Sequence, residues 1–152
     1  MRNILSIAIL LLAFTACKKD KFSTEPQIKF ESVDPNVASI QIGSEIPDIN
    51  FSITDKEGDI GQKLGVDTAF IYLKNNLTGK SDSVPFPNLS NAGKESFQAD
   101  VSVSINKVLE CKSLPSGALH VDTLYFDVYV RDFARNKSNV ITTGAPIFFS
   151  CR

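Results

Sequence analysis

The chain is poor in the side chains on which many catalytic and metal centres depend. Its 152 residues include one histidine, His120, one methionine at position 1 and no tryptophan. A single imidazole argues against histidine-based acid–base catalysis and against a multi-histidine zinc site. The 16 basic and 17 acidic side chains nearly cancel, so the basic excess typical of nucleic-acid-binding proteins is missing. We therefore expect neither an enzyme nor a nucleic-acid partner.

The first sixteen residues have the three parts of a secretory signal. Arg2 supplies a positive charge, residues 4–14 form an uncharged apolar run, and small residues precede Cys17. The run is shorter than the roughly 20 residues that a membrane-spanning helix needs. The cysteine at the cleavage point resembles the lipobox of bacterial lipoproteins. This resemblance implies that residues 1–16 are a signal peptide and that Cys17 is the lipidated N-terminus, anchored to a membrane. An ordinary secretory signal beside an unrelated cysteine is the alternative.

The residues after the cysteine predict a linker and a location. Residues 17–26 are polar and have no helical periodicity, so we expect a flexible, lipid-anchored tether. Removing 16 of the 152 residues leaves 136, the size of one domain, and the loss of Arg2 changes the formal net charge from −1 to −2. The start Cys17-Lys18-Lys19-Asp20 resembles small lipoproteins of the Bacteroidota. The resemblance implies the cell envelope, with the outer membrane expected and its periplasmic or surface face left open.

From residue 27 onward, short segments alternate between apolar and polar residues, which is typical of half-buried strands. We expect strands at 27–33, 48–54, 67–74, 96–105, 122–131 and 138–149, with a break near 144–146 and an edge strand at 81–84. Either Ala69, Ile71 and Leu73 or Phe70 and Tyr72 could face the core of the third segment. A helical period extends over no more than one turn, at 105–109.

Six or seven antiparallel strands predict an all-β fold, either a two-sheet sandwich or a small closed barrel. Residues 132–138, Asp-Phe-Ala-Arg-Asn-Lys-Ser, resemble the hairpin Asp-x-Ala-Gly-Asn-x-Ser between the last two strands of bacterial immunoglobulin-like domains. Arg135 stands where glycine is usual, at a left-handed turn position. Together with Gly58-Asp59-Ile60-Gly61, this segment again resembles small Bacteroidota lipoproteins. The resemblance implies an immunoglobulin-like or fibronectin-III-like β-sandwich of about seven strands over residues 27–152.

Two cysteines remain once Cys17 is assigned to lipid, and disulfides persist in exported proteins. In a seven-strand sandwich, the connection after strand 96–105 and the end of the last strand lie at the same end of the domain. We therefore expect a disulfide between Cys111 and Cys151, with two free thiols as the alternative.

Carboxylates are concentrated in the loop after the second expected strand. Carboxylate oxygens are ligands for calcium, and in an immunoglobulin-like topology this loop shares an end with hairpin 132–137. The candidate ligands are Asp55, Glu57, Asp59, Asp132 and Asn136. An acidic, solvated turn is the alternative. Because these residues lie in polar loops, we expect no desolvated carboxylate, which argues against a glycosidase-type acid–base pair.

Two further sets of residues are candidates for recognition or modification. Tyr125, Tyr129 and Arg131 share the polar face of segment 122–131, and tyrosine and arginine are enriched at interfaces, so they could form a binding strip. A second packing surface, or surface aromatics that form no common site, is the alternative. Asp-Ser/Thr-apolar tripeptides resemble the O-glycosylation site of exported Bacteroidota proteins. Their hydroxyl residues are Thr68, Ser83 and Thr123.

The sequence thus favours a lipid-anchored, non-catalytic module that binds a protein or a glycan, or that acts as an accessory subunit. A calcium-dependent adhesion or binding module and a structural envelope protein are the alternatives. Calcium is the one cofactor considered, and a membrane is an expected partner through the lipid anchor.

Overall fold

The computed structural model describes residues 22–41, 43–63, 67–87, 95–114 and 118–151. The expected signal peptide 1–16, the lipidation site Cys17 and the first part of the tether lie outside these residues. Over the described ranges the chain folds into strands, turns and loops. Within them, no helix is long and apolar enough to span a membrane.

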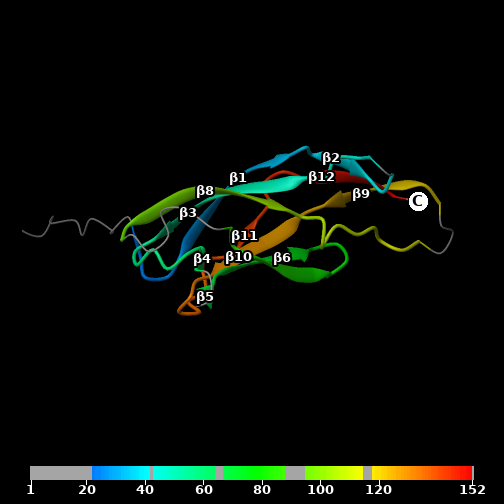
Figure 1. The fold of residues 1–152 in the computed structure, drawn as a ribbon. Coiled ribbons are helices and arrows are strands. Elements are labelled where there is room, and N and C mark those ends of the chain that lie inside the picture. Colours follow the sequence, from blue (N-terminus) through cyan, green and yellow to red (C-terminus); the bar gives the residue numbers. More distant parts are fainter. Residues whose placement is uncertain (1–21, 42, 64–66, 88–94, 115–117, 152) are drawn as a thin grey trace, which may run out of the picture.

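The strands form three sheets and one short ladder (Figure 1). The first sheet, in the order β1-β3-β8, consists of β1 (Gln27–Asp34), β3 (Asp48–Asp55) and β8 (Phe97–Ser104). The second, in the order β11-β10-β6-β7, consists of β11 (Ile141–Thr142), β10 (Phe126–Arg131), β6 (Phe70–Asn75) and β7 (Ser81–Pro85). The third, in the order β2-β12-β9, consists of β2 (Val37–Ser39), β12 (Ile147–Cys151) and β9 (His120–Leu124). The ladder pairs β4 (Gln62–Lys63) with β5 (Asp67–Thr68).

The second and third sheets are connected by two continuous chain segments, each of which contributes one strand to each sheet. Only Tyr125 separates β9 from β10, and β12 and β11, their respective partners, are also consecutive. Buried side chains of all three sheets form one hydrophobic core. No sheet of the described residues closes on itself, so the all-β expectation is confirmed and the arrangement is consistent with a β-sandwich rather than a closed barrel.

The apolar alternation predicted the core strands well. In β3, Ile49, Phe51 and Ile53 are fully buried, while the residues between them are half-buried. In segment 67–74 the structure selects the first of the two open alternatives, because Ile71 and Leu73 are buried whereas Tyr72 is half-buried on the outer face. The edge strand expected at 81–84 is β7, the last strand of the second sheet. The helical turn at 105–109 also forms.

Three features differ from the expected strands. Segment 67–74 is divided at Ala69 into β5, which pairs with the unpredicted β4, and β6, which belongs to the second sheet. Segment 122–131 is not one strand, because the chain bends at Tyr125 and the two parts, β9 and β10, pair with different neighbours. The short strand β2 was not predicted, and it runs parallel to β12, so the fold is not wholly antiparallel. A parallel pair needs a long connection, and here almost the whole domain lies between the two strands.

The described end of the expected tether contacts the folded part. Lys56 N donates to Ser23 O at 3.1 Å, and Thr24 Oγ1 donates to Glu57 Oε1 at 3.1 Å. Residues 22–26 therefore lie against the loop after β3 and are not a free linker.

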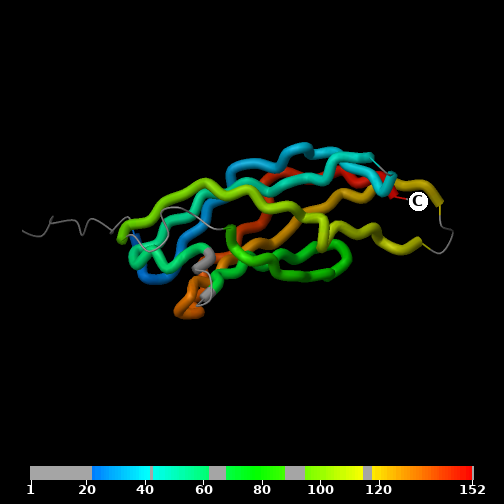
Figure 2. Tube along the Cα trace, in the orientation of Figure 1, coloured from blue at the N-terminus to red at the C-terminus, as the bar shows by residue number. Residues whose placement is uncertain are grey.

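The two ends of the fold carry different features. The hairpin between β10 and β11 lies at one end of the molecule and the C-terminal end of β12 at the other (Figure 2). The first end holds the acidic residues and the second the cysteines described below.

Candidate functional site

Three carboxylates meet at the end of the fold formed by the β3–β4 loop and the β10–β11 hairpin. Asp55 is the last residue of β3 and continues the inward phase of Phe51 and Ile53, because side chains of a strand alternate with period two. Asp132 likewise follows Val130 in the inward phase of β10. Both carboxylates are therefore buried, with exposed fractions of 0% for Asp55 and 1% for Asp132. Asp59, from the loop after β3, is half-buried beside them.

The three side chains bring oxygen atoms close together. One carboxylate oxygen from each of Asp55, Asp59 and Asp132 lies within 4.8 Å of the others. Gly58 N donates to Asp55 Oδ2 at 2.6 Å. Asn136 donates to Asp132 twice, from its backbone N to Oδ1 at 2.7 Å and from Nδ2 to Oδ2 at 2.9 Å. These N–H groups fix the orientation of the carboxylates, but they do not neutralise three negative charges.

Two oxygens of this group have no donor. Asp55 Oδ1 and Asp59 Oδ1 are buried and accept no hydrogen bond from any described residue. The salt bridges of the described chain lie elsewhere and involve none of these three carboxylates. Asp55 and Asp59 can bond each other only when one carries a proton, since two carboxylates are both acceptors. An unsatisfied buried acceptor is costly, so this cluster is arranged for a proton or a cation.

Burial changes the protonation of the cluster. Loss of water contact raises the pKa of Asp55 to about 7; the Gly58 N–H opposes this rise, and the charges of Asp59 and Asp132 add to it. Burial also raises the pKa of Asp132, although the hydrogen bonds from Asn136 oppose it. The expectation that no carboxylate is desolvated is therefore wrong for Asp55 and Asp132, because both continue a buried strand phase into the loops.

The other two expected ligands have different places. Glu57 is exposed, and its carboxylate accepts the bond from Thr24. Asn136 directs its N–H groups toward Asp132 and so supports that carboxylate. The hairpin is closed by Arg135, whose φ of 72° is the left-handed conformation expected for this position. Arg131 donates from its guanidinium to Arg135 O at 2.9 Å, which ties its side chain to the hairpin.

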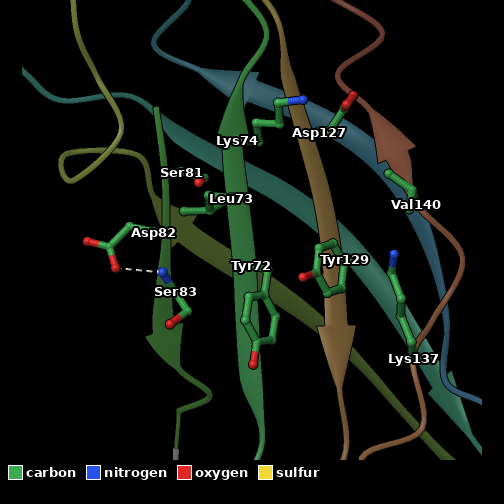
Figure 3. Close-up of a pocket in the computed structure, with 10 residues that line it drawn as sticks. All are labelled: Tyr72, Leu73, Lys74, Ser81, Asp82, Ser83, Asp127, Tyr129, Lys137 and Val140. Carbon is green, nitrogen blue, oxygen red and sulfur yellow. Dashed lines mark hydrogen bonds between the residues drawn. The ribbon is translucent and has the colours of Figure 1, made fainter. Parts of the chain in front are cut away.

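A groove lies on the outer face of the second sheet, with a volume of about 510 Å³. Tyr72 of β6 and Tyr129 of β10 are directly opposite each other across the two strands. Their rings are stacked, with centroids 4.6 Å apart and planes at 3° (Figure 3). Lys137 Nζ lies 4.1 Å from the centroid of the Tyr129 ring. Tyr129 is thus enclosed between Tyr72 and Lys137, a stabilising cation–π arrangement.

Polar side chains surround this tyrosine pair. Asp127 accepts from Asn76 Nδ2 at 2.9 Å and from Thr142 Oγ1 at 2.7 Å. Burial tends to raise the pKa of Asp127, but these two bonds and the charge of Lys74 outweigh it and lower the pKa. Asp82 lies on the β7 side of the groove, where its Oδ1 accepts from Ser83 N (Figure 3). The groove therefore combines aromatic rings with groups of both charge signs.

Of the three residues of the expected binding strip, only Tyr129 lines the groove. Tyr125 lies at the bend between β9 and β10 with 40% exposure, and Arg131 serves the hairpin. Sequence reasoning missed Tyr72 and Lys137 as groove residues. The pairing of Tyr72 with Tyr129 depends on strand register, which a single sequence does not give.

The candidate glycosylation residues lie in three environments. Thr123 is exposed on β9, Thr68 is half-buried, and Ser83 lines the groove.

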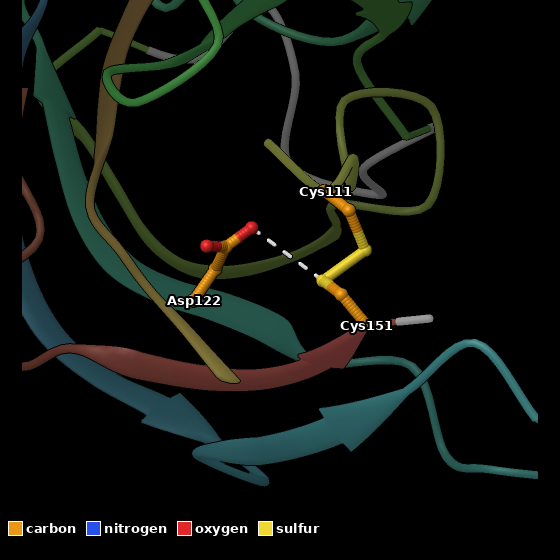
Figure 4. A group of neighbouring side chains, drawn as sticks. All are labelled: Cys111, Asp122 and Cys151. Carbon is orange, nitrogen blue, oxygen red and sulfur yellow. Dashed lines mark hydrogen bonds between the residues drawn. A yellow bond between two sulfur atoms is a disulfide. The ribbon is translucent and has the colours of Figure 1, made fainter. Parts of the chain in front are cut away.

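The opposite end of the fold carries the expected disulfide between Cys111 and Cys151 (Figure 4). Asp122 Oδ2 lies 3.5 Å from Cys151 Sγ, and it accepts a hydrogen bond from Lys112 N at 2.7 Å. A disulfide sulfur carries no proton and is not a thiolate, so the Asp122 contact is neither a sulfur-donated bond nor part of a metal site. His120 is the first residue of β9; its Nδ1 lies 2.9 Å from Ala118 O and its Nε2 lies 3.5 Å from Asp122 Oδ1.

Searches with this chain found no matching family model, no similar curated protein and no similar solved structure.

Proposed function

We propose that the chain is a non-catalytic glycan-binding module of the cell envelope, anchored by lipid on Cys17. The observation that carries the binding role is the stacked pair of Tyr72 and Tyr129 in a groove with hydrogen-bonding groups on both sides. The anchor and the envelope location rest on the sequence of the first twenty residues. The outer membrane is the membrane we assign to it.

The proposed fold is an immunoglobulin-like or fibronectin-III-like sandwich. Counting β9–β10 and β11–β12 as one strand each gives seven long strands, of which the first, second and fifth form one sheet. The third, sixth and seventh are neighbours in the other sheet, as in immunoglobulin domains. The fourth, β7, pairs with the third, whereas in immunoglobulin constant domains it joins the first sheet.

The chemistry of the groove suits a sugar. A pyranose ring has an apolar C–H face that packs against an aromatic ring and hydroxyls that both donate and accept. One ring face of Tyr129 is covered by Tyr72 and the other by Lys137. Tyr72 has one ring face against Tyr129, and its other face is covered by neither Tyr129 nor Lys137. The carboxylates of Asp82 and Asp127 can accept hydrogen bonds from sugar hydroxyls, and the ammonium groups of Lys74 and Lys137 can donate them. Two acids and two bases balance, which favours an uncharged glycan over an acidic one.

A binding role fits these residues better than catalysis. Among the described residues, neither histidine nor cysteine lines the groove. Partial burial tends to raise the pKa of Asp127, but hydrogen bonds from Asn76 and Thr142 hold this pKa below its ordinary value. Asp55 and Asp132, which are desolvated, lie at the hairpin end and do not line the groove. An acid–base pair must flank a bound substrate, so the two features required for glycoside hydrolysis are in different places.

The binding role is tested by affinity electrophoresis of the full chain through gels that contain neutral or acidic polysaccharides. We expect retardation by at least one neutral polysaccharide. Tyr72→Ala and Tyr129→Ala should weaken it by about fivefold or more, because loss of a stacking surface costs on the order of 1 kcal/mol or more. Tyr125→Ala is the matched control, since Tyr125 is an exposed tyrosine outside the groove. Equal losses in all three variants, or no retardation of the parent chain, would reject the glycan role and leave a structural one.

The anchor is tested separately by growing cells with a labelled fatty acid. The chain should incorporate the label, and Cys17→Ser should abolish incorporation. Label retained in Cys17→Ser would show that the cysteine is not the acylated residue. Protease treatment of intact and lysed cells then assigns the face, because digestion without lysis requires exposure on the surface.

A further inference from the structure

We propose that Asp55, Asp59 and Asp132 bind a calcium ion that joins the β3–β4 loop to the β10–β11 hairpin. An acidic cluster alone does not identify a metal site, but two carboxylate oxygens of this cluster are buried without a hydrogen-bond donor in the described part of the chain. Asp55 is completely buried, yet its Oδ1 accepts no hydrogen bond from the described residues. Asp59 is half-buried as a residue, but its Oδ1 atom is buried and also accepts no hydrogen bond from the described residues. Two buried carboxylate oxygens of the cluster thus lack a donor among these residues, and a cation bound among the three side chains would satisfy them.

The spacing of the oxygens matches calcium. Atoms that lie at most 4.8 Å apart can be reached from one central point that is at most about 2.8 Å from each, the separation divided by √3. Calcium–oxygen distances are about 2.3–2.6 Å, so a small contraction of the cluster would bring one oxygen of each carboxylate to bonding distance. The other carboxylate oxygens and water would supply the rest of the roughly six to eight ligands that calcium takes. Magnesium demands about 2.0–2.1 Å and strict octahedral geometry, which three carboxylates from two irregular loops supply less readily.

The surrounding backbone holds the ligands in place before any ion binds. Gly58 N fixes Asp55 through Oδ2, Ala134 N bonds Asp59 Oδ2 at 3.3 Å, and Asn136 holds both oxygens of Asp132. Phe133 N also donates to Asp59 O at 3.1 Å, so the loop and the hairpin are already in contact. A carboxylate oxygen can accept from an N–H group and still bind a metal, because it has two lone pairs. The protein supplies the geometry, and the ion would supply the missing positive charge.

A shared proton is the competing way to satisfy the same oxygens. With one proton, Asp55 could donate to Asp59, and the raised pKa of Asp55 is compatible with that state near neutral pH. The proton removes one negative charge and serves one pair, while a divalent ion contacts all three residues. The two explanations differ in their response to Asp55→Asn, whose amide can donate to Asp59 but carries no charge.

The test is the melting temperature of the full chain, purified in detergent at pH 8, with 5 mM CaCl₂ or with EDTA. We expect calcium to raise it by at least about 5 °C, because an ion that binds only the folded state at a concentration far above its dissociation constant stabilises that state. Calorimetric titration should give one calcium per chain. Asp55→Asn and Asp132→Asn should each remove most of the calcium-dependent shift. Glu57→Gln is the matched control, because it removes a carboxylate of the same loop that is exposed and outside the cluster.

Three outcomes would overturn the proposal. The first is no calcium-dependent shift in the parent chain, and a more stable Asp55→Asn variant in EDTA would then indicate the shared proton. The second is a shift that Asp55→Asn leaves unchanged, which would place the ion elsewhere. The third is an equal shift with MgCl₂, which would contradict the assignment to calcium. The readout needs no glycan, so this proposal stands or fails independently of the binding role.

Discussion

Asn139 forms two hydrogen bonds with the backbone of Ile28, as a neighbouring strand would. Ile28 N donates to Asn139 Oδ1 at 2.8 Å, and Asn139 Nδ2 donates to Ile28 O at 2.9 Å. Because β1 is an edge strand of the first sheet, these backbone groups have no strand partner on that side. The amide therefore closes part of an open sheet edge and ties β1 to the segment that precedes β11.

Removing this amide should loosen the contact between the two sheets. Asn139→Ala loses two hydrogen bonds and leaves the edge of Ile28 unpaired, so we expect the free energy of unfolding to fall by about 1–2 kcal/mol. Asn50→Ala is the control, because its amide makes one exposed bond to Ser32 Oγ at 3.1 Å, and its cost should be below about 0.5 kcal/mol. Urea unfolding measures both variants. Equal costs would mean that the paired geometry of Asn139 adds nothing.

The disulfide should contribute a large share of the stability. Cys111 and Cys151 are 40 residues apart, and closing a loop of that length stabilises by about 3–4 kcal/mol through the entropy of the unfolded chain. The double variant Cys111→Ala/Cys151→Ala should lose about that amount in urea unfolding. Reduced parent protein should show a similar loss, and this comparison separates the bond from the packing of the buried Cys151 side chain. A difference below about 1 kcal/mol in both samples would contradict the expectation.

The alternation of buried residues in the strands predicts the burial of two residues of the acidic cluster, but the sequence analysis assigned these residues to solvated loops. Asp55 lies two residues after Ile53 and so continues the buried phase of β3 by one step. Asp132 does the same after Val130 in β10. The topology correctly predicted that the two loops meet, but a polar residue after a strand is ordinarily taken as solvated. In each strand, the next inward-facing position lies two residues beyond the last buried apolar side chain. Assigning that position to the core would have predicted the burial of Asp55 and Asp132.

Other features of the fold depend on which strands pair and in which register, and the alternation of apolar residues does not give this information. Burial alternates without interruption from Leu124 through Tyr125 to Phe126, so the change of partner between β9 and β10 leaves no mark on the pattern. The strand β2 has three residues, too few to show any period. The groove likewise depends on Tyr72 facing Tyr129, which is set by the register of β6 against β10.

The stability of the metal-free protein should fall as the pH rises. The pKa of Asp55 is about 7 in the folded state against 3.8 as the ordinary value, so the folded state binds a proton more tightly than the unfolded state. The stabilisation is complete below about pH 4 and is lost as the pH rises through about 7. The negative charges of Asp59 and Asp132, which face Asp55, raise the pKa of Asp55 further.

Urea unfolding in EDTA at pH 5 and pH 8 measures this loss. We expect the parent chain to be less stable at pH 8, by an amount on the order of a few kcal/mol at most. Asp55→Asn removes the titrating group and should flatten the dependence, while Glu57→Gln should keep the parent slope. The same slope in Asp55→Asn and the parent chain would assign the pH dependence to other groups.

Arg135 should be replaceable by glycine with a gain in stability. Its φ of 72° lies in the left-handed region, where a Cβ costs about 1–2 kcal/mol and glycine costs nothing. Its backbone makes the useful contacts, since the N–H bonds Asp132 O at 3.2 Å and the carbonyl accepts from Arg131, and glycine retains both. Glycine also gives the unfolded chain more freedom, which returns about 0.4–1 kcal/mol of the gain. Arg135→Gly should therefore stabilise by up to about 1 kcal/mol in urea unfolding, while Arg135→Ala, which keeps the Cβ, should give no gain. If alanine stabilises as much as glycine, the arginine side chain and not the backbone is the source of the cost.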